Sequence, residues 1–353
     1  MEVLADIPII GLVFQLISFL AHIITTNGAG ILALATPIAL GAMCGVMNER
    51  SGIVNIGIEG MMLASAFTGW FVCSVVATSF PMDPVVFGLT PAVVLGLIAA
   101  LSTGMIASLV HAWLSISLKV DQIISGTIIN IVAFGVTGYL HLLLSRTSTP
   151  SGGTFDTFRP PPVLTDLPVI GWLLKAVLQQ GPVTMSMLVL VVVLQILLIR
   201  SRWGLRTRAV GEHPKAAETV GIDVIRLRYR NVVIGGAFAG LAGAWFTLDY
   251  GGTFETGMTN GRGFIALAAL IFGRWHPVGA FLAALLFAAS GTLGIAIRTS
   301  PPTGQLGDIL ASIPEQVFSG LPYIVTIFVL AGVVGRSIPP AAVGRPYERE
   351  ATH

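Results

Sequence analysis

Two short polar stretches interrupt an otherwise apolar chain, and both contain carboxylates beside glycines. In the first, residues 51–63, Asn55 and Glu59 lie four apart and share one face of a helix. An ionised carboxylate at mid-membrane costs at least ~2.5 kcal/mol, so such a glutamate faces water, has a partner or marks a functional pathway. We therefore take Asn55 and Glu59 as pathway candidates. The alternative is that Glu59 lies at the membrane interface and caps the following helix.

The second stretch, residues 248–264, gathers acidic, aromatic and amide side chains beside five glycines. Irregular backbone is tolerated at membrane depth only where it lines a cavity or is buried in protein. The ten apolar residues 264–273 that follow would rise only ~15 Å as a helix, which is half the length of a spanning helix. We therefore expect a half-length helix that follows an unwound turn. This favours a translocation site, and an external loop rich in Gly, Thr and Asn is the alternative. The candidates here are Asp249, Tyr250, Phe254, Glu255 and Asn260.

Enzymatic motifs are missing from the chain. It contains no G-x-x-x-x-G-K-[ST], H-E-x-x-H or G-x-S-x-G sequence. The six histidines show no i, i+3 or i+4 pairing, and we expect each at a helix end or an interface. Cys44 and Cys73 fall in apolar stretches without histidines at ligand spacing, so we expect two small core residues. We therefore expect no catalytic residue and no metal site.

The composition indicates a membrane protein. Of 353 residues, 54% are apolar and 10% are charged, against roughly 25% charged in a soluble domain. The mean hydropathy is +0.86, which exceeds what a soluble core needs. A net charge of only +2 excludes an overall field that would attract nucleic acid. The N-terminus has Glu2 and Asp6 but no positive n-region, so we expect its apolar segment to be retained as a helix.

Ten apolar runs bounded by Gly, Pro or charge predict an all-α, polytopic fold with about ten transmembrane helices. The eighth is too short to span alone, and whether it spans or re-enters stays open. We expect one transmembrane domain over residues 1–336 and a tail over 337–353. The runs cover residues 7–25, 29–47, 57–79, 91–113, 123–144, 183–200, 231–250, 264–273, 277–297 and 321–336.

Positive charge predicts the orientation of these helices. Eight of the 19 Lys and Arg residues lie between Arg200 and Arg230, which indicates a cytoplasmic loop over residues 200–230. Counting helices outward places both termini in the cytoplasm and residues 145–182 outside, although that external loop contains three basic residues.

The polar stretches 48–60 and 251–263 stand in corresponding places, each after a helix. Halves that begin at the second and seventh helices are five helices apart, and an odd offset gives them opposite orientations. This is the plan of a 5+5 inverted repeat. We see no residue-level identity between the halves, so this hypothesis rests on hydropathy alone.

The basic loop contains its own helix signals. Pro214 suits a first helical turn, Glu212 suits the helix dipole, and Gly221 suits the end of the helix. Ala216 and Ala217 between them favour helix and let another protein surface approach closely. The alternative is that the loop is only a positively charged topology signal.

Three segments together resemble the membrane permease subunits of bacterial ATP-binding-cassette importers for simple sugars, nucleosides and branched-chain amino acids. The resemblance covers roughly residues 29–336, and its segments are ERSGIVNIGIEGMMLASAF at 49–67, RAVGEHPKAAETVGI at 208–222 and NGRGFIALAALIFGRWHPVGAF at 260–281. In such permeases an AAxxxG coupling helix docks in the ATPase, and Ala216, Ala217 and Gly221 match it here. His213 and Lys215 depart from the usual asparagine and glutamate. The resemblance implies ATPase coupling by Arg208, Gly211, Glu212, Pro214, Ala216, Ala217 and Gly221.

The resemblance also implies an assembly. It contains an ABC ATPase that binds ATP and magnesium, a second, different permease, and an external substrate-binding lipoprotein. This chain itself would bind no cofactor and would be a multi-pass protein of the bacterial plasma (inner) membrane. The amino-acid sequence of residues 49–63 looks most like that of the nucleoside-type permeases.

A nucleoside needs stacking rings and hydrogen-bonding groups rather than an ion pair. Phe67, Tyr250 and Phe254 could stack on a base, and Asn55, Glu59 and Asn260 could bond a ribose. Ribose alone would fit the same polar groups, so simple sugars stay open.

Two other classes compete with the importer. Glu59, Asp249 and Glu255 could serve a proton-coupled secondary transporter, which has no need of an AAxxxG element. An ion channel or structural membrane scaffold, the other class, would need a pore ring of like charges, which no span displays. The sequence leaves open which substrate is carried and which residues touch it.

Overall fold

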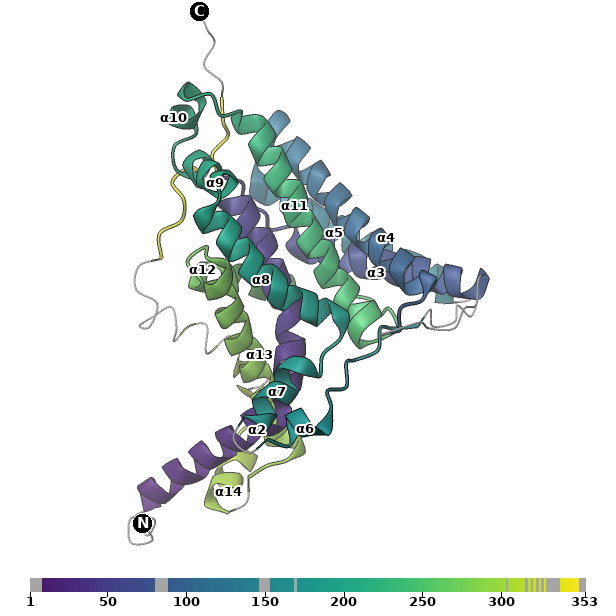
Figure 1. The fold of residues 1–353 in the computed structure, drawn as a ribbon, viewed down its shortest axis with the longest axis vertical. Helices are drawn as coiled ribbons and strands as arrows, with labels where there is room; N and C mark the ends of the chain where they lie inside the picture. Colours follow the sequence, from purple (N-terminus) through teal and green to yellow (C-terminus); the bar gives the residue numbers. More distant parts are fainter. Residues whose placement is uncertain are drawn as a thin grey trace, which may run out of the picture. The chain divides into compact units, whose positions relative to one another are not determined.

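The computed structural model describes residues 8–79, 88–145, 153–167, 170–302, 304–314 and 337–348, with a few single residues between 317 and 327. Every regular element in these residues is helical. Seven of their helices are long and apolar enough to cross a membrane, so the chain is a polytopic helical membrane protein (Figure 1). The expected span 321–336 lies almost wholly outside the described residues.

The chain forms two compact units. One comprises residues 1–35, 159–180 and 285–335, and the other comprises residues 36–158, 181–284 and 336–353. Two long helices, α2 (Pro8–Glu49) and α13 (Pro277–Thr299), pass from one unit to the other. Every candidate residue named above lies in the second unit.

The expected helices 7–25 and 29–47 are one helix, which corrects the predicted count. Helix α2 has 42 residues and is therefore ~63 Å long, about twice the thickness of the hydrocarbon layer. Gly28 lies between the two expected helices, but a glycine inside a helix costs only ~1 kcal/mol. A Cβ on Gly28 would lie 3.1 Å from Cβ of Ala176 in α7 (Gly171–Leu178), so close packing occupies the position where the break was expected.

The core of the second unit is a group of closely packed helices. Helices α3 (Ile58–Ser79), α4 (Pro91–Ala112) and α11 (Val224–Ala244) contact one another, and α5 (Gln122–Ser145) packs on α3 (Figure 1). Small residues bring the α4 and α11 backbones together, because a Cβ on Gly104 would lie 2.3 Å from the carbonyl oxygen of Gly236. Such contacts replace the hydrophobic driving force that is absent between helices in lipid.

Two of these helices end in a π-helical turn. Helix α4 continues as η1 (Trp113–Ser117), and α11 continues as η2 (Trp245–Tyr250). Such turns occur often at functional sites. Here η2 carries Asp249 and Tyr250 toward α8 (Pro182–Arg200), which it contacts. The short eighth span is α12 (Arg262–Phe272), a helix of 11 residues that packs against α3.

The basic stretch is more helical than expected. It contains α9 (Arg202–Glu212), α10 (Pro214–Thr219) and the start of α11, which begins at Val224 rather than at 231. Asp223 explains the early start, because its Oδ1 accepts a hydrogen bond from the backbone N of Arg226 at 3.0 Å and so caps the helix. The arginines of residues 224–230 therefore lie on a helix.

The first unit has its own small core of Phe19, Ile23, Ala296, Ile297 and Phe318. The expected external loop 145–182 belongs largely to this unit, and its described part contains α6 (Pro162–Thr165) and α7. A further short helix, α14, covers Gln305–Ala311.

Candidate functional site

Glu59 lies in the first turn of α3, and its carboxylate contacts the start of α12. Its Oε1 accepts hydrogen bonds from Thr259 Oγ1 at 2.7 Å and Gly261 N at 2.8 Å, and its Oε2 accepts one from Gly263 N at 2.6 Å. The first N–H groups of a helix have no partner within the helix, and the helix dipole favours an anion there. The N-cap residue of α12 is Gly261, which has no side chain to fill this role. Glu59 thus caps a helix about 200 residues away in the sequence.

Gly263 allows this approach. A Cβ at Gly263 would lie 2.6 Å from both Cα and N of Glu59, a distance that would force the backbones apart. The alternative for Glu59, that it caps the helix that directly follows it, is not what the structure shows, because the helix that its carboxylate caps is α12.

Asn55 and Asn130 shape the backbone before α3. Asn55 is fully buried, and its Oδ1 accepts a hydrogen bond from Gly57 N at 3.0 Å in a local turn. Asn130 on α5 donates to the carbonyl oxygen of Ile56 at 3.0 Å and accepts from Gly60 N at 2.7 Å. The sequence reasoning missed Asn130, although an amide inside an apolar span is a recognisable signal.

Asp249 has a role parallel to that of Glu59. Its carboxylate accepts hydrogen bonds from Val183 N at 3.4 Å and from both N and Oγ1 of Thr184 at 3.3 Å. These are the first residues of α8, whose N-cap residue is Gly181. Asp249 at the end of η2 therefore caps α8.

An aromatic cluster lies between α3, α5 and the turn before α12. The rings of Phe67 and Phe254 meet edge to face at 5.2 Å, and His141 lies 5.2 Å from Phe254 and 5.5 Å from Trp70. Trp70 and Phe254 are also neighbours, at 6.1 Å. Within the described part of the chain, the buried Nδ1 of His141 has no hydrogen-bond partner. We call Phe67, Trp70, His141 and Phe254 the ring cluster.

The sequence reasoning found only half of this cluster. It named Phe67 and Phe254, and the structure brings them together across 187 residues of sequence. It missed Trp70 and did not single out His141, which lies four residues before the end of α5 at Ser145. A histidine inside a span without charged residues was the available signal.

Three further predicted pathway residues have exposed side chains and are not members of the ring cluster. Tyr250 is 63% exposed and stacks on Trp245, with ring centroids 4.8 Å apart. Glu255 and Asn260 are exposed on the turn between η2 and α12. Asn260 has a positive φ of 44°, a conformation that asparagine tolerates better than most residues.

The predicted helix in the basic loop is confirmed as α10. His213 precedes it, Pro214 opens it and Gly221 follows it at a φ of +82°. Gly221 N donates to the Glu218 carbonyl at 2.8 Å, and Ile222 N donates to the Ala217 carbonyl at 3.1 Å. This pair of bonds is the Schellman motif. Ala216 is exposed, whereas Ala217 is buried against the rest of the unit.

A segment near the C-terminus is attached to this region. Ala342 N donates to the Gly211 carbonyl at 2.9 Å, and Ala341 N donates to Glu212 Oε2 at 3.1 Å. The Tyr347 hydroxyl is hydrogen-bonded to Glu218. The expected tail 337–353 is therefore, over 341–347, packed on α9 and α10, which sequence reasoning did not foresee.

Arg50, which follows α2, contacts the turn between α12 and α13. Its Nε donates to the Trp275 carbonyl at 2.9 Å, and its Nη2 lies 3.4 Å from His276 Nε2. Burial lowers the pKa of His276, and the positive charges of Arg50 and Arg208 lower it further. Burial also lowers the pKa of Arg50, against the effect of Glu212. Arg208 itself donates to the Ile199 carbonyl at 3.3 Å.

The two cysteines and the acidic residues form no metal centre in the part of the chain that is described. No group of three or more His, Cys, Asp or Glu side chains gathers there. Cys44 and Cys73 are buried free thiols, as expected for small core residues.

Residues 27–330 match the protein family described as branched-chain amino acid transport system / permease component. The guanosine ABC transporter permease protein NupQ of Bacillus subtilis is 38% identical over 327 residues, which are 90% of this chain and 94% of that protein. The nucleoside ABC transporter permease protein NupC of Lactococcus lactis is 34% identical over 90% of this chain and 95% of that protein.

A more distant relative is the glucose ABC transporter permease protein TsgB13 of Haloferax volcanii. It is 26% identical over 73% of this chain and 66% of that protein. No solved structure matches the chain.

Proposed function

The chain belongs to the family of branched-chain amino acid transport system permease components, and on this premise we propose that it is a permease subunit of an ATP-binding-cassette importer of nucleosides. The observation that carries the substrate class is the likeness to NupQ and NupC, whose names state guanosine and nucleoside transport, over 90% of this chain.

We propose the following assembly around the chain. A separate ATPase binds ATP and magnesium and docks on α10, with Arg208, Gly211, Glu212, Pro214, Ala216, Ala217 and Gly221 forming or supporting the docking surface. A second, different permease completes the pathway, and an external lipoprotein delivers the substrate. The complex lies in the bacterial inner membrane with both termini of this chain in the cytoplasm and residues 145–182 outside. A 5+5 inverted repeat of helices would suit the alternation between inward and outward states.

The ring cluster is our proposed contact for the base. Aromatic rings gain from edge and face contacts with another π-system, and the clustered rings of Phe67, Trp70 and Phe254 offer both. The unpartnered Nδ1 of His141 supplies a hydrogen-bonding group at the same place. Contact with a base requires the rings to separate, which is a movement expected of alternating access.

The polar candidates divide into two groups in this proposal. Tyr250, Glu255 and Asn260 are exposed and available to a hydroxylated ribose. Asn55, Glu59 and Asp249 have their polar atoms engaged in backbone hydrogen bonds. These three hold the pathway in shape.

Reconstituted uptake tests the function. The chain would be co-expressed with its ATPase, second permease and lipoprotein and placed in liposomes, with labelled guanosine, ribose and glucose as substrates. We expect guanosine uptake that needs both ATP and the lipoprotein. Uptake by the chain alone under a pH gradient would overturn the proposal in favour of a proton-coupled transporter.

Glucose is the second candidate substrate, because TsgB13 is named as a glucose permease. ATP-dependent uptake of glucose or ribose, with none of guanosine, would keep the importer and change the substrate class.

The ring cluster has a matched test. Trp70→Ala removes a ring from it, and Trp113→Ala removes an exposed tryptophan from η1. We expect Trp70→Ala to lower guanosine uptake by about tenfold, the equivalent of one lost stacking contact of ~1.4 kcal/mol. Trp113→Ala should leave uptake nearly unchanged. Equal uptake by the two variants would remove the ring cluster from the pathway.

Coupling to the ATPase has a separate test. Ala216→Arg places a large cation on the exposed face of α10, and Leu205→Arg does the same on exposed α9. We expect the first to abolish ATP-driven uptake without loss of folded protein, and the second to retain it. Normal uptake by Ala216→Arg would contradict docking on α10.

A further inference from the structure

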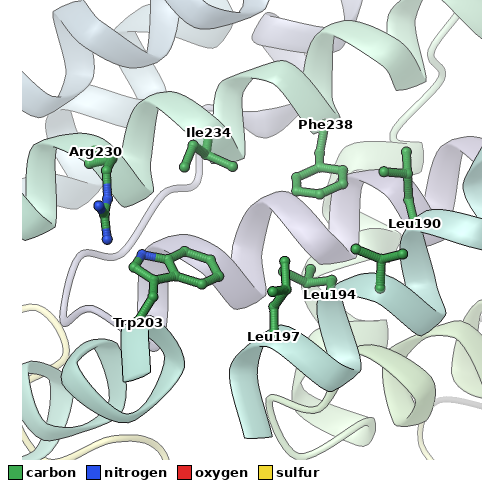
Figure 2. A pocket seen from close by; sticks show the side chains of 8 residues that line it. Leu190, Leu194, Leu197, Trp203, Arg230, Ile234 and Phe238 are labelled. Carbon is green, nitrogen blue, oxygen red and sulfur yellow. The ribbon is translucent and has the colours of Figure 1, made fainter. Parts of the chain in front are cut away.

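Two adjoining hollows lie where α8 and α11 meet the basic stretch. The first, the apolar groove, has a volume of about 350 Å³ and is lined chiefly by Leu190, Val193 and Leu197 of α8 and by Ile234 and Phe238 of α11 (Figure 2). The second, the arginine pocket, has a volume of about 510 Å³ and contains Arg202, Arg206, Arg226 and Arg230. Trp203 and Arg230 line both hollows.

The charge of the arginine pocket suits an anion. Its four arginines face one carboxylate among the lining residues, that of Asp223, which lies 3.8 Å from Arg226. Arg202, Arg206 and Arg230 are exposed. Guanidinium groups bind phosphate with paired hydrogen bonds.

The junction between the hollows is held rigidly. Trp203 donates from Nε1 to Asn231 Oδ1 at 3.1 Å, and Asn231 donates in turn to Thr207 Oγ1 at 3.0 Å. Arg230 lies over the Trp203 ring, with its Cζ 5.7 Å from the centroid. Figure 2 shows Arg230 and Trp203 at one end of the row of apolar side chains. An indole in this place is typical of the membrane interface.

The length of the groove along its helices is close to the thickness of one membrane leaflet. Its α11 side runs from Arg230 to Phe238, eight residues or ~12 Å along the helix, and a leaflet is half of the ~30 Å hydrocarbon layer. Both sides lie within helices long and apolar enough to cross a membrane. A soluble protein cannot enter at this depth, whereas an acyl chain can.

We propose that the groove and the pocket together bind one anionic phospholipid, with its phosphate among the arginines and an acyl chain in the groove. A ligand that fills both the basic pocket and the adjoining apolar groove must have an anionic head and an apolar tail. A phospholipid has both, whereas a free phosphate has no tail and a soluble peptide does not enter at this depth. Basic pockets between spanning helices are known to suit anionic headgroups. The site is independent of the transported substrate.

The test uses the full-length chain, purified in mild detergent, and native mass spectrometry with added lipid. The probes are phosphatidylglycerol and phosphatidylcholine with the same acyl chains. We expect the wild type to retain phosphatidylglycerol preferentially. Arg206→Gln with Arg230→Gln should weaken its binding on the order of thirtyfold, since each basic residue contributes ~1 kcal/mol and 1.4 kcal/mol is tenfold.

The control pair is Arg200→Gln with Arg274→Gln, which removes two exposed arginines that line neither hollow. It should change binding less than about twofold. The groove has its own pair on adjacent residues. Val193→Trp fills the groove and should weaken both lipids, whereas Val192→Trp lies outside its lining and should not.

Three results would overturn the proposal: equal binding of the two lipids by the wild type, unchanged binding in the Arg206 and Arg230 variant, or equal effects of the two valine variants. If the arginine variant instead weakened assembly with the ATPase while lipid binding persisted, the pocket would belong to a protein partner. Thermal unfolding of each variant without added lipid confirms that it is folded.

Discussion

Glu59 and Asp249 are two carboxylates of one membrane-embedded unit that do the same task with different geometry. Each caps a helix whose own N-cap residue is a glycine, Gly261 in one case and Gly181 in the other. Glu59 makes three bonds of 2.6–2.8 Å, whereas those of Asp249 are 3.3–3.4 Å. The shorter bonds are in the range of strong, charge-assisted hydrogen bonds.

The comparison shows that a carboxylate inside a membrane protein can stabilise the fold by capping a helix. A helix start without a capping side chain leaves unpaired N–H groups, and in a bilayer no water is at hand to satisfy them. A carboxylate from another helix satisfies them, and its own charge is stabilised by the same bonds. Gly263 makes room for Glu59, and Gly181 makes room for Asp249.

The largest effect is expected from Glu59→Ala. It leaves Gly261 N, Gly263 N and the Thr259 hydroxyl without their acceptor, so the free energy of unfolding should fall by about 3 kcal/mol. Thermal unfolding of the purified chain in detergent measures this change. Glu255→Ala, which removes an exposed carboxylate from the neighbouring turn, should stay within about 0.5 kcal/mol. Equal stability of the two variants would contradict the capping role of Glu59.

A smaller loss is expected from Gly263→Ala. The added Cβ would lie 2.6 Å from the backbone of Glu59, and relieving such an overlap costs about 2 kcal/mol. Gly135→Ala is the control, because no atom lies within 4 Å of its added Cβ. That variant should be neutral or up to about 1 kcal/mol more stable, since alanine favours helix. The same unfolding measurement ranks the pair, and a stable Gly263→Ala would mean that α3 and α12 are farther apart.

Asp249→Ala should have the smallest effect, a loss of about 1 kcal/mol, as is usual for a helix cap. A double-mutant cycle with Gly181→Ala sharpens the comparison. A Cβ at Gly181 would lie 2.1 Å from Asp249 Oδ1, so Gly181→Ala should cost less once Asp249 is replaced. Strictly additive losses of stability would show that the two residues do not contact each other.

Local signals in the sequence predicted much of the fold. Apolar runs predicted the spans that became α3, α4, α5, α8 and α13, because crossing a bilayer demands about 20 predominantly apolar residues whatever their partners. Pro214 and Gly221 predicted the limits of α10, since each acts on its own backbone. Prediction was wrong in separating residues 7–25 from residues 29–47, because α2 continues through both and packs at Gly28 against α7.

The sequence by itself thus determined the membrane class, most of the helices and the short helix α10, all of which depend on neighbours within a few residues. It also singled out Glu59 and Asp249 as unusual. Only the tertiary structure decided what they do, because the N–H groups that they accept from lie about 200 and 65 residues away. The ring cluster and the C-terminal segment on α9 and α10 were decided in the same way, by contacts between distant parts of the chain that local preferences do not encode.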